Sequence, residues 1–191
     1  MGCTHRILMR MFGRPEGLLG RLGGVIMART NRDAGAAVIE LRNVRPSEKV
    51  LEVGFGPGVG IQFLARLASA GYVAGVDQSP EMVRQASVRN AGAIGSGNVD
   101  LRHGSADALP FPDEIFDKAV AVNSMQAWPD AASGLREMRR VLKPGGNIAL
   151  GFTPYSGQSR HGITEALTAA GFTKARMVER ERVFCAIAFK P

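Results

Sequence analysis

The sequence predicts one open α/β domain, in which a mostly parallel sheet has helices on both faces and ends in a C-terminal antiparallel hairpin. Three observations support this prediction. Short apolar segments alternate along the chain with helical patterns, and glycine-rich turns separate the two. The last two apolar segments are joined by too few residues for a crossover, so they must pair antiparallel. The chain has 191 residues, which is enough for one sizeable core.

Seven apolar segments are the expected strands. They span residues 49–55, 72–77, 98–103, 116–123, 147–152, 174–180 and 183–190. The fourth segment is apolar at every position from Ala119 to Val122, which indicates burial on both faces, as in a parallel sheet.

Helical patterns lie between these strands, and several have clear end signals. One helix is expected over residues 59–70, with Gly71 as the left-handed residue that ends it. Ser79 and Asp130 are the expected N-caps of two further helices. The segment Lys-Pro-Gly-Gly at residues 143–146 is expected to stop the second of these helices and to form a turn.

Residues 1–45 are expected to form an arginine-rich helical arm or lid, and residues 46–191 the ligand-binding domain. A first amphipathic piece of the arm carries the apolar residues Leu18, Leu19, Leu22, Val25 and Ile26. Three glycines weaken it as a helix: Gly20, Gly23 and Gly24. A second piece, with Asn31 as its expected N-cap, places on one face Ala34, Ala37, Val38 and Leu41.

The charge and the cysteines narrow the class of protein. The net charge is +7, but the arginines are dispersed, which favours a solvated basic surface over an anionic partner such as RNA, acidic lipid or a phosphorylated substrate. Cys3 and Cys185 lack metal-ligand spacing, so no metal site is expected, and Cys185 lies in an apolar stretch typical of burial. No apolar run approaches the length of about 20 residues that spans a bilayer, so a cytoplasmic location is the expectation.

A glycine-rich turn follows the first expected strand. Residues 52–60 read Glu-Val-Gly-Phe-Gly-Pro-Gly-Val-Gly, and alternate glycines let a ligand approach the backbone closely. The helix after this turn directs its first N–H groups to the same place. The dinucleotide pattern G-x-G-x-x-G fails whether it starts at Gly54 or at Gly56. Glu52, just before the turn, suits a ligand that carries an ammonium group.

Asp77 ends the second expected strand. An acid at this place in a βαβ unit can accept hydrogen bonds from both ribose hydroxyls. The alternative is a surface acid that caps the next turn. Because the strands are parallel, Asp77 and the glycine turn should meet at the same edge of the sheet.

Four motifs occur in order along the chain: LEVGFGPG, GVDQSPEMV, GSADALPFPDEIFD and REMRRVLKPGG. Together they resemble class I S-adenosylmethionine-dependent methyltransferases, in the type 11-like branch that includes quinone, sterol and other small-molecule or lipid methyltransferases. The resemblance covers about residues 44–152. It implies a Rossmann-like, seven-stranded sheet, S-adenosylmethionine as cofactor, and methyl transfer to a small-molecule or lipid-like acceptor.

The resemblance also implies roles at matched positions. For the methionine half of the cofactor, Glu52 and the loop of Gly54, Gly56 and Gly58 would hold the amino-acid end. Asn123 would end the fourth strand under the sulfonium and face the acceptor.

For the adenosine half, Asp77 would bind the ribose hydroxyls and Gln78 would lie beside the adenine. Ala106 would offer its backbone to the ring, and Asp107 would bind the ring's amino group. Met82 could pack on the adenine, or could simply be a helix residue that faces the core.

The sequence does not assign a general base. His161 and Tyr155 follow the fifth strand on the correct edge of the sheet, but a lone histidine at such a place is more often an ordinary loop residue. His103 lies near the expected adenine site and favours a packing role. Trp128 is expected either as an apolar wall of the acceptor pocket or as a packing residue for the following helix.

The residues after the fourth strand narrow the class of acceptor. The Asn-Ser-Met-Gln at residues 123–126 is not the Asn/Asp-Pro-Pro-Tyr/Phe turn of adenine and amide methyltransferases. The connection at residues 153–162 is short, so the arm and residues 124–128 are expected to build the acceptor pocket. We therefore expect a lipid-like or aromatic acceptor, with an arm that could close as a lid or contact a membrane surface.

Three alternatives stay open at this stage. One is a cofactor-binding regulatory or partner protein without methyltransferase activity, since no base is assigned. A second is an RNA methyltransferase, which only the net charge supports. A third is a nicotinamide-dependent oxidoreductase, which the glycine spacing disfavours.

Overall fold

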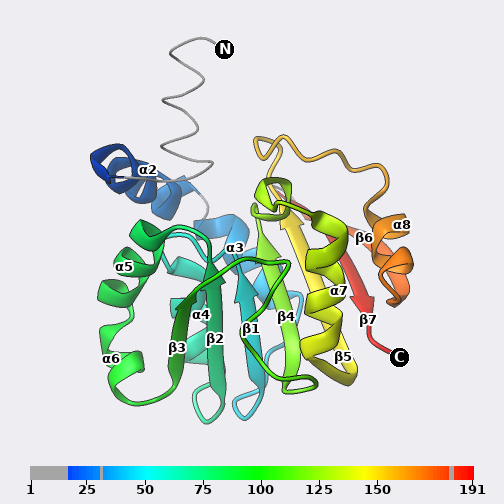
Figure 1. Cartoon of the computed structure of the whole chain (residues 1–191), viewed down its shortest axis with the longest axis horizontal. Coiled ribbons are helices and arrows are strands. Elements are labelled where there is room, and N and C mark those ends of the chain that lie inside the picture. The colour runs from blue at the N-terminus through cyan, green and yellow to red at the C-terminus, as the bar shows by residue number, and fades with distance from the viewer. Residues whose placement is uncertain (1–16, 31, 181–182) are drawn as a thin grey trace.

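The computed structural model describes residues 17–30, 32–180 and 183–191 of the chain. Seven strands form one sheet in the order β3-β2-β1-β4-β5-β7-β6 (Figure 1). Their bounds are β1 Lys49–Val53, β2 Tyr72–Asp77, β3 Val99–His103, β4 Phe116–Val122, β5 Leu142–Phe152, β6 Thr173–Arg180 and β7 Val183–Phe189. The first five pair parallel, and β7 pairs antiparallel with β5 and β6. The predicted fold class, including its terminal hairpin, is confirmed.

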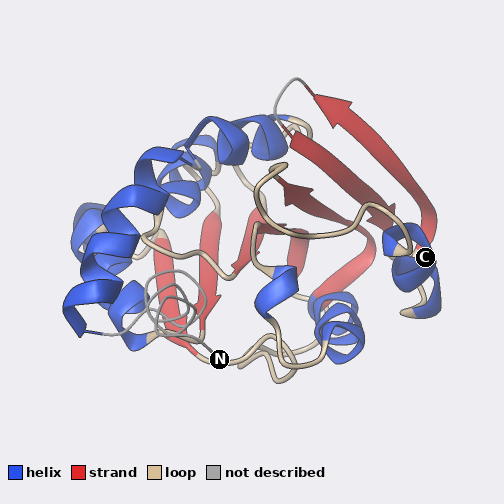
Figure 2. Ribbon diagram, turned by 90° about the horizontal axis from the view of Figure 1, so that it is seen from above, coloured by secondary structure: helices blue, strands red, loops and turns tan. Residues whose placement is uncertain are grey.

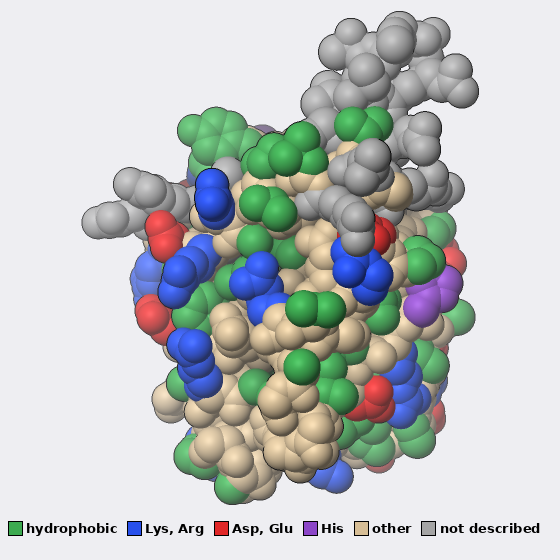
Figure 3. Space-filling view, turned by 90° about the vertical axis from the view of Figure 1, so that its left-hand side faces the viewer, with side chains coloured by type: hydrophobic (Ala, Val, Ile, Leu, Met, Phe, Trp, Pro, Cys, Tyr) green, Lys and Arg blue, Asp and Glu red, His purple; other side chains and the backbone are tan. Residues whose placement is uncertain are grey.

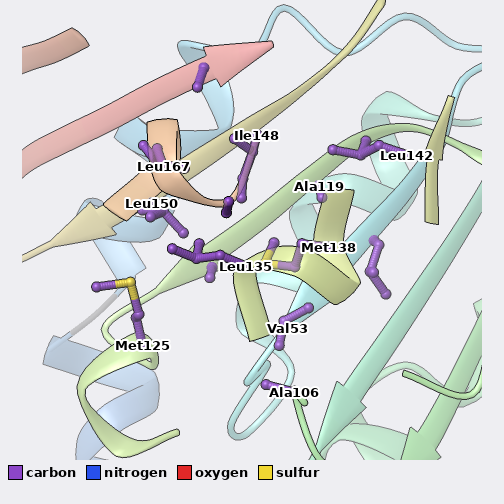
Figure 4. Close-up of a cluster of buried hydrophobic side chains, with 14 of the residues drawn as sticks. Val53, Ala106, Ala119, Met125, Leu135, Met138, Leu142, Ile148, Leu150 and Leu167 are labelled. Carbon is purple, nitrogen blue, oxygen red and sulfur yellow. The ribbon is translucent and has the colours of Figure 1, made fainter. Parts of the chain in front are cut away.

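Helices cover both faces of the sheet (Figure 2). Their bounds are α2 Gly17–Thr30, α3 Arg32–Glu40, α4 Val59–Leu67, α5 Pro80–Arg89, α6 Ala91–Gly95, the 3₁₀ helix η2 Met125–Ala127, α7 Ala131–Val141 and α8 Ile163–Ala169. Two buried clusters lie on opposite faces of the sheet. The first, called the α7 core, includes Leu135 and Met138 of α7 and Leu167 of α8. The second, called the α4 core, includes Val38 of α3, Leu64 of α4 and Ala86 of α5. Figure 4 shows Leu135 and Met138 of α7 within the α7 core.

Successive side chains of β1 point to opposite faces of the sheet and therefore pack in different cores. Val50 packs in the α4 core, whereas Leu51 and Val53 pack in the α7 core. Glu52 therefore points to the α4 side of the sheet. The burial of β4 on both faces also agrees with its unbroken apolar sequence, since Ala119 and Val120 pack in different cores.

Two predicted helix caps are confirmed by their hydrogen bonds. The Ser79 hydroxyl accepts from the Met82 N–H at 3.3 Å, and Asp130 Oδ1 accepts from the Ala132 N–H at 2.9 Å. Each bond satisfies a backbone donor that has no partner inside the helix. Cys185 is fully buried, as its apolar surroundings indicate.

Two turn predictions are wrong. Helix α4 ends at Leu67, and Gly71 is not in the left-handed region; it is glycine because a Cβ there would overlap with the Glu48 carbonyl. The predicted helix stop at residues 143–146 is confirmed, since α7 ends at Val141, but the predicted turn is not. Residues 143–146 lie within β5, which begins at Leu142. The pairing with β4 shifts register there, and the Lys190 N–H donates to the Gly146 carbonyl at 2.8 Å.

The described part of the predicted arm contacts the rest of the domain. On α3, Ala34 and Val38 are buried in the α4 core, with Ala37 and Leu41 partly buried against it. This is the face that the sequence predicts, while the predicted cap Asn31 lies outside the described residues. Helix α2 packs against α5 and α3. No helix among the described residues is both long and apolar enough to cross a membrane.

A buried ion pair fastens the segment between α3 and β1 to the sheet. Lys118 on β4 donates to Glu48 Oε2 at 2.5 Å and to the Asn43 carbonyl at 2.9 Å. Glu48 also accepts from the Arg45 N–H at 2.8 Å. These hydrogen bonds satisfy two charges that would otherwise be buried at a large cost in stability.

Helix α3 approaches β5 so closely that Gly151 has no room for a side chain. A Cβ at Gly151 would overlap with Val38. We expect Gly151→Ala to lower the free energy of unfolding by about 1–3 kcal/mol through overpacking. In Val38→Ala/Gly151→Ala the new methyl group gains space, so the double variant should lose less than the sum of the two single losses.

Urea denaturation of the four proteins in this cycle measures the effect. Gly92→Ala on α6, where an added Cβ meets nothing within 4 Å, is the matched control and should be neutral or slightly stabilising. Additive losses in the double variant would contradict the close contact.

Candidate cofactor site

The turn after β1 runs close to neighbouring strands because its glycines adopt left-handed backbone angles. Gly54, Gly56 and Gly58 have φ values of +75°, +54° and +81°. The Gly54 N–H donates to the Val76 carbonyl at 2.7 Å, and a Cβ at Gly54 would overlap with Ser124. At Gly56 an added Cβ would meet no atom within 4 Å. A ligand can therefore approach the backbone at Gly56.

The Glu52 carboxylate is buried beneath the first turn of α4. It fits there because residue 60 is glycine, where a Cβ would overlap with Glu52 Oε1. Glu52 is only 4% exposed, and Oε2 has no hydrogen-bond partner among the described residues. Burial, and secondly the charge of Asp77, raise the pKa of Glu52 to about 8. The site thus contains an acid that a cationic group of a ligand could pair with.

Asp77 is the second buried acid, at the end of β2. Its Oδ1 accepts from the Ser79 N–H at 2.9 Å, and its Oδ2 accepts from the Gly56 N–H at 2.8 Å. Burial raises the pKa of Asp77, and these two hydrogen bonds oppose that rise. Each carboxylate oxygen keeps a lone pair for a further donor, such as a hydroxyl group.

Two adjoining cavities open at this edge of the sheet. The Asp77 cavity, about 600 Å³ with its open mouth, is lined by Met27, Val53, Gly54, Gly56, Val76, Asp77, Gln78, Met82, Gly104, Ala106, Asn123, Ser124, Ala127, Trp128 and Pro129. The Glu52 cavity, about 510 Å³, is lined by Met27, Gly35, Glu52, Gly54, Phe55, Gly56, Pro57, Val59, Gly60, Val122 and Asn123. They share Met27, Gly54, Gly56 and Asn123. One elongated ligand could therefore occupy both.

Most of the residues that the motifs indicate line these cavities: Glu52, Gly54, Gly56, Asp77, Gln78, Met82, Ala106 and Asn123. Gly58 and Asp107 do not. Gly58 instead lets α4 begin against α5, since a Cβ there would lie 2.6 Å from Ala86 Cβ. Asp107 is half-buried and follows Ala106 in the chain.

Three lining residues have a second role in the fold. Met82 is 1% exposed, so it both faces the core and lines the Asp77 cavity. Asn123 has a φ of +49°, and its Oδ1 accepts from the Thr153 N–H at 2.8 Å, which joins the ends of β4 and β5. Trp128 lines the cavity and also packs on α7, where a Cβ at Gly134 would lie 2.6 Å from the indole.

Several lining residues were not assigned to the site from the sequence, among them Val76, Gly104 and Pro129 and two residues of the arm. Met27 of α2 lines both cavities, and Gly35 of α3 lines the Glu52 cavity. Both belong to the expected arm. The sequence predicts that the arm helps to build the acceptor pocket, because the connection at residues 153–162 is short, but it does not specify which residues of the arm reach the site.

The ionisable side chains among the described lining residues are Glu52 and Asp77. His103 Nε2 lies 3.1 Å from the Gln78 carbonyl, outside both cavities. Tyr155 and His161 are exposed and line neither cavity. Within the described ranges, no group of three or more His, Cys, Asp or Glu residues could hold a metal ion.

The loop that supplies Ala106 to the Asp77 cavity is held from α7. Glu137 Oε2 accepts from the Leu109 N–H at 2.9 Å. Arg140 donates to the Leu109 carbonyl at 3.0 Å and to the Phe111 carbonyl at 2.8 Å. Three hydrogen bonds from one helix turn thus fix the position of a loop that has no regular structure of its own.

We expect Glu52→Gln to change how stability depends on pH. With the pKa of Glu52 raised to about 8 from 4.5, the folded protein holds a proton that the unfolded chain releases between these values. The native stability therefore falls as the pH rises through this window, by about 1.4 kcal/mol per pH unit for one proton. The variant lacks this loss, so it should be more stable than the parent protein at pH 8.

Urea denaturation from pH 5 to 8 without ligand measures the difference. Glu165→Gln, at an exposed position on α8, is the matched control and should run parallel to the parent protein in this range. Parallel curves for Glu52→Gln as well would show that Glu52 is charged in the folded state.

Comparison with known proteins identifies the family. A family model described as a methyltransferase domain matches residues 50–146. The uncharacterized methyltransferase YdaC of Bacillus subtilis is 29% identical over 182 residues, covering 89% of this chain and 98% of that protein. The demethylmenaquinone methyltransferase of Geobacillus kaustophilus is 34% identical over 138 residues, covering 72% of this chain and 58% of that protein.

A solved structure supports the same fold. The S-adenosylmethionine-dependent methyltransferase from Aquifex aeolicus superposes with a TM-score of 0.75 at 22% identity, covering 85% of this chain and 94% of that chain. The matched family model spans the glycine turn, both buried acids and the loop that α7 holds. The chain therefore belongs to the class I S-adenosylmethionine-dependent methyltransferases, in the type 11-like branch, and S-adenosylmethionine is its cofactor.

Proposed function

We propose that this methyltransferase acts on a small apolar acceptor with an aromatic or quinone-type ring, bound at the mouth of the Asp77 cavity. The observation that carries this proposal is the apolar part of the lining of this cavity, which includes Met27, Ala127, Trp128 and Pro129. Such a surface favours a flat apolar ring over a charged or heavily hydrated acceptor. The similarity to the demethylmenaquinone methyltransferase of Geobacillus kaustophilus supports the same class of acceptor.

The methionine end of the cofactor is proposed to lie in the Glu52 cavity. The unpartnered Oε2 of Glu52 can accept from the ammonium group, and the open backbone at Gly56 leaves room for the chain of the amino acid. The N-terminus of α4 favours the carboxylate at the same place. Gly54 and Asn123, which line both cavities, would flank the sulfonium.

The adenosine end is proposed to lie in the Asp77 cavity. Asp77 would accept from the ribose hydroxyls with its remaining lone pairs, while Gln78, Met82 and Ala106 would surround the adenine. Asp107, next to Ala106, would accept from the adenine amino group. Gly58 would act indirectly, by setting where α4 starts.

When bound, S-adenosylmethionine supplies an electrophilic methyl group on its sulfonium. The protein's part is to align the acceptor with that methyl group and to exclude water. Met27 and Gly35 belong to residues 1–45, so their place in the lining supports the proposal that this arm is a lid over the domain of residues 46–191. A base is needed only if the acceptor arrives protonated, and the two lining acids are already assigned to the cofactor.

The alternatives make different predictions from this one. An RNA acceptor rests on the net charge of +7, yet several arginines are already engaged within the protein, such as Arg84 with Glu81 and Arg140 with Glu137. A regulatory or partner protein would bind the cofactor and transfer nothing. Methyl transfer therefore separates the three.

We expect Asp77→Asn to weaken binding of S-adenosylmethionine by about 10- to 100-fold, because charge-assisted hydrogen bonds to the ribose are lost. Calorimetry measures the affinity, and a melting curve checks that the variant is folded. Asp100→Asn on the edge strand β3 is the matched control and should bind normally. Unchanged affinity in Asp77→Asn would remove the ribose assignment.

Transfer of a labelled methyl group tests the acceptor class, with a demethylated quinol and with total RNA as substrates. Label in the quinol is the expected result. Label in RNA alone would establish the second alternative, and cofactor binding without transfer to either would favour the partner protein.

Arg140 is expected to act as a positioning residue for the cofactor. Arg140→Lys keeps the charge but loses the fork that bonds to two carbonyls, so the KM for S-adenosylmethionine should rise about tenfold. The KM for the acceptor should not change. Arg136→Lys, on the same helix and hydrogen-bonded to Ser133 of that helix, is the control and should behave as the parent protein. Equal rises in both KM values in Arg140→Lys would indicate a general loss of structure instead.

A further inference from the structure

Helix α2 packs on the domain through its glycines. Gly20, Gly23 and Gly24 are all buried, and a Cβ at Gly24 would overlap with Gln85 of α5. The Gln85 side chain also donates to the Gly20 carbonyl at 3.5 Å. These glycines weaken α2 as an isolated helix, but together they form the face through which α2 approaches α5 closely. One turn further, Met27 continues this face and lines both cavities.

The opposite face of α2 carries large aliphatic side chains that point away from the protein. Leu22 and Val25 are 53% and 50% exposed. A helix on the surface of a globular protein normally buries such residues and exposes its small or polar ones. Helix α2 has the reverse arrangement, so its apolar face is available for contact with another molecule.

Positive charge lies beside this apolar face. Arg29 is exposed and follows Leu22 and Val25 at helical spacing, so it lies on the same face of α2. The sequence of α2 contains no Asp or Glu. Figure 3 looks onto the side of the molecule where α2 and α5 lie, and hydrophobic and Lys or Arg side chains are mixed there. Aliphatic side chains flanked by arginine suit the boundary between the head groups and the acyl chains of an anionic bilayer.

We propose that the outward face of α2, formed by Leu22, Val25 and Arg29, docks on an anionic lipid bilayer, and that a membrane-dissolved acceptor enters past Met27. This inference rests on the proposed apolar acceptor. It adds the source of that acceptor and its route of entry: the same helix contacts the bilayer with one face and the reaction site with the other. A stable interface with a protein partner or a second copy of the chain buries about 800 Å² on each side, which is more than these three side chains offer.

Vesicle flotation with the full chain tests the docking. We expect binding to phosphatidylcholine vesicles that contain phosphatidylglycerol, little binding to phosphatidylcholine alone, and release by salt. Leu22→Ser/Val25→Ser should lower the bound fraction about tenfold, and Arg29→Gln by about threefold. Leu67→Ser, at a 40% exposed position at the end of α4, is the matched control and should bind normally.

Two further measurements keep this test separate from the proposed function. Calorimetry with S-adenosylmethionine should give the same affinity in all variants, because Leu22, Val25 and Arg29 point away from the cavities. Methyl transfer to a water-soluble short-chain quinol should also be unchanged, whereas transfer to a long-chain quinol in anionic vesicles should fall with the bound fraction.

Failure of docking and failure of the proposed function then look different. No vesicle binding by the full chain, or equal binding by Leu22→Ser/Val25→Ser, would overturn the docking proposal even if the soluble quinol is methylated. A dimer in light scattering that this double variant dissociates would assign the face to a second copy instead. Absence of transfer to both quinols would remove the proposed function, whether or not the chain binds vesicles.

Discussion

Close backbone packing around the turn after β1 is the constraint on which the site depends. A Cβ at Gly54 would overlap with Ser124, and a Cβ at Gly60 would overlap with Glu52. The turn can therefore touch the end of β4 and still leave a buried acid under α4. Gly56 has open space on its side-chain side, so one position of the same turn remains accessible to a ligand. Two kinds of glycine therefore shape the cavities. At Gly54 and Gly60 a side chain would overlap with a neighbour, whereas at Gly56 the space beside the backbone is open.

The arrangement of the strands around this turn also has an electrostatic consequence. Parallel strands bring Glu52 and Asp77 to one edge of the sheet, and burial raises the pKa of both acids. An acid held in this way makes the protein less stable at neutral and alkaline pH than it would otherwise be. S-adenosylmethionine carries two positive groups, and on the proposed placement these groups would offset that cost. A ligand that binds only the folded state then stabilises it by an amount that grows with the logarithm of the ligand concentration divided by Kd.

Local signals predicted most of the fold and most of the polar residues that line the cavities, because strand ends, caps and glycine turns are set by neighbours in the sequence. The errors at Gly71 and at residues 143–146 share one cause. Glycine serves both for left-handed backbone and for close approach, and the sequence does not distinguish a turn from a strand whose backbone pairs with a distant segment. Met27 was missed for a related reason: its place in the lining depends on which face of α2 packs, and the glycines there predicted weakness rather than contact.

Helix α2, with its glycines packed inward and its aliphatic side chains outward, links the proposed acceptor to the cofactor. Packing through glycine buries little apolar area, so α2 gains little from its contact with α5 compared with a helix that buries leucine and valine. Burial of Leu22 and Val25 in a bilayer would supply the missing stabilisation from outside, on the docking that we propose. Because Met27 lies on the same helix, a contact that holds α2 in place also holds part of the lining of both cavities. Docking on the bilayer would then favour enclosure of the cofactor, and cofactor binding would favour docking by the same coupling free energy.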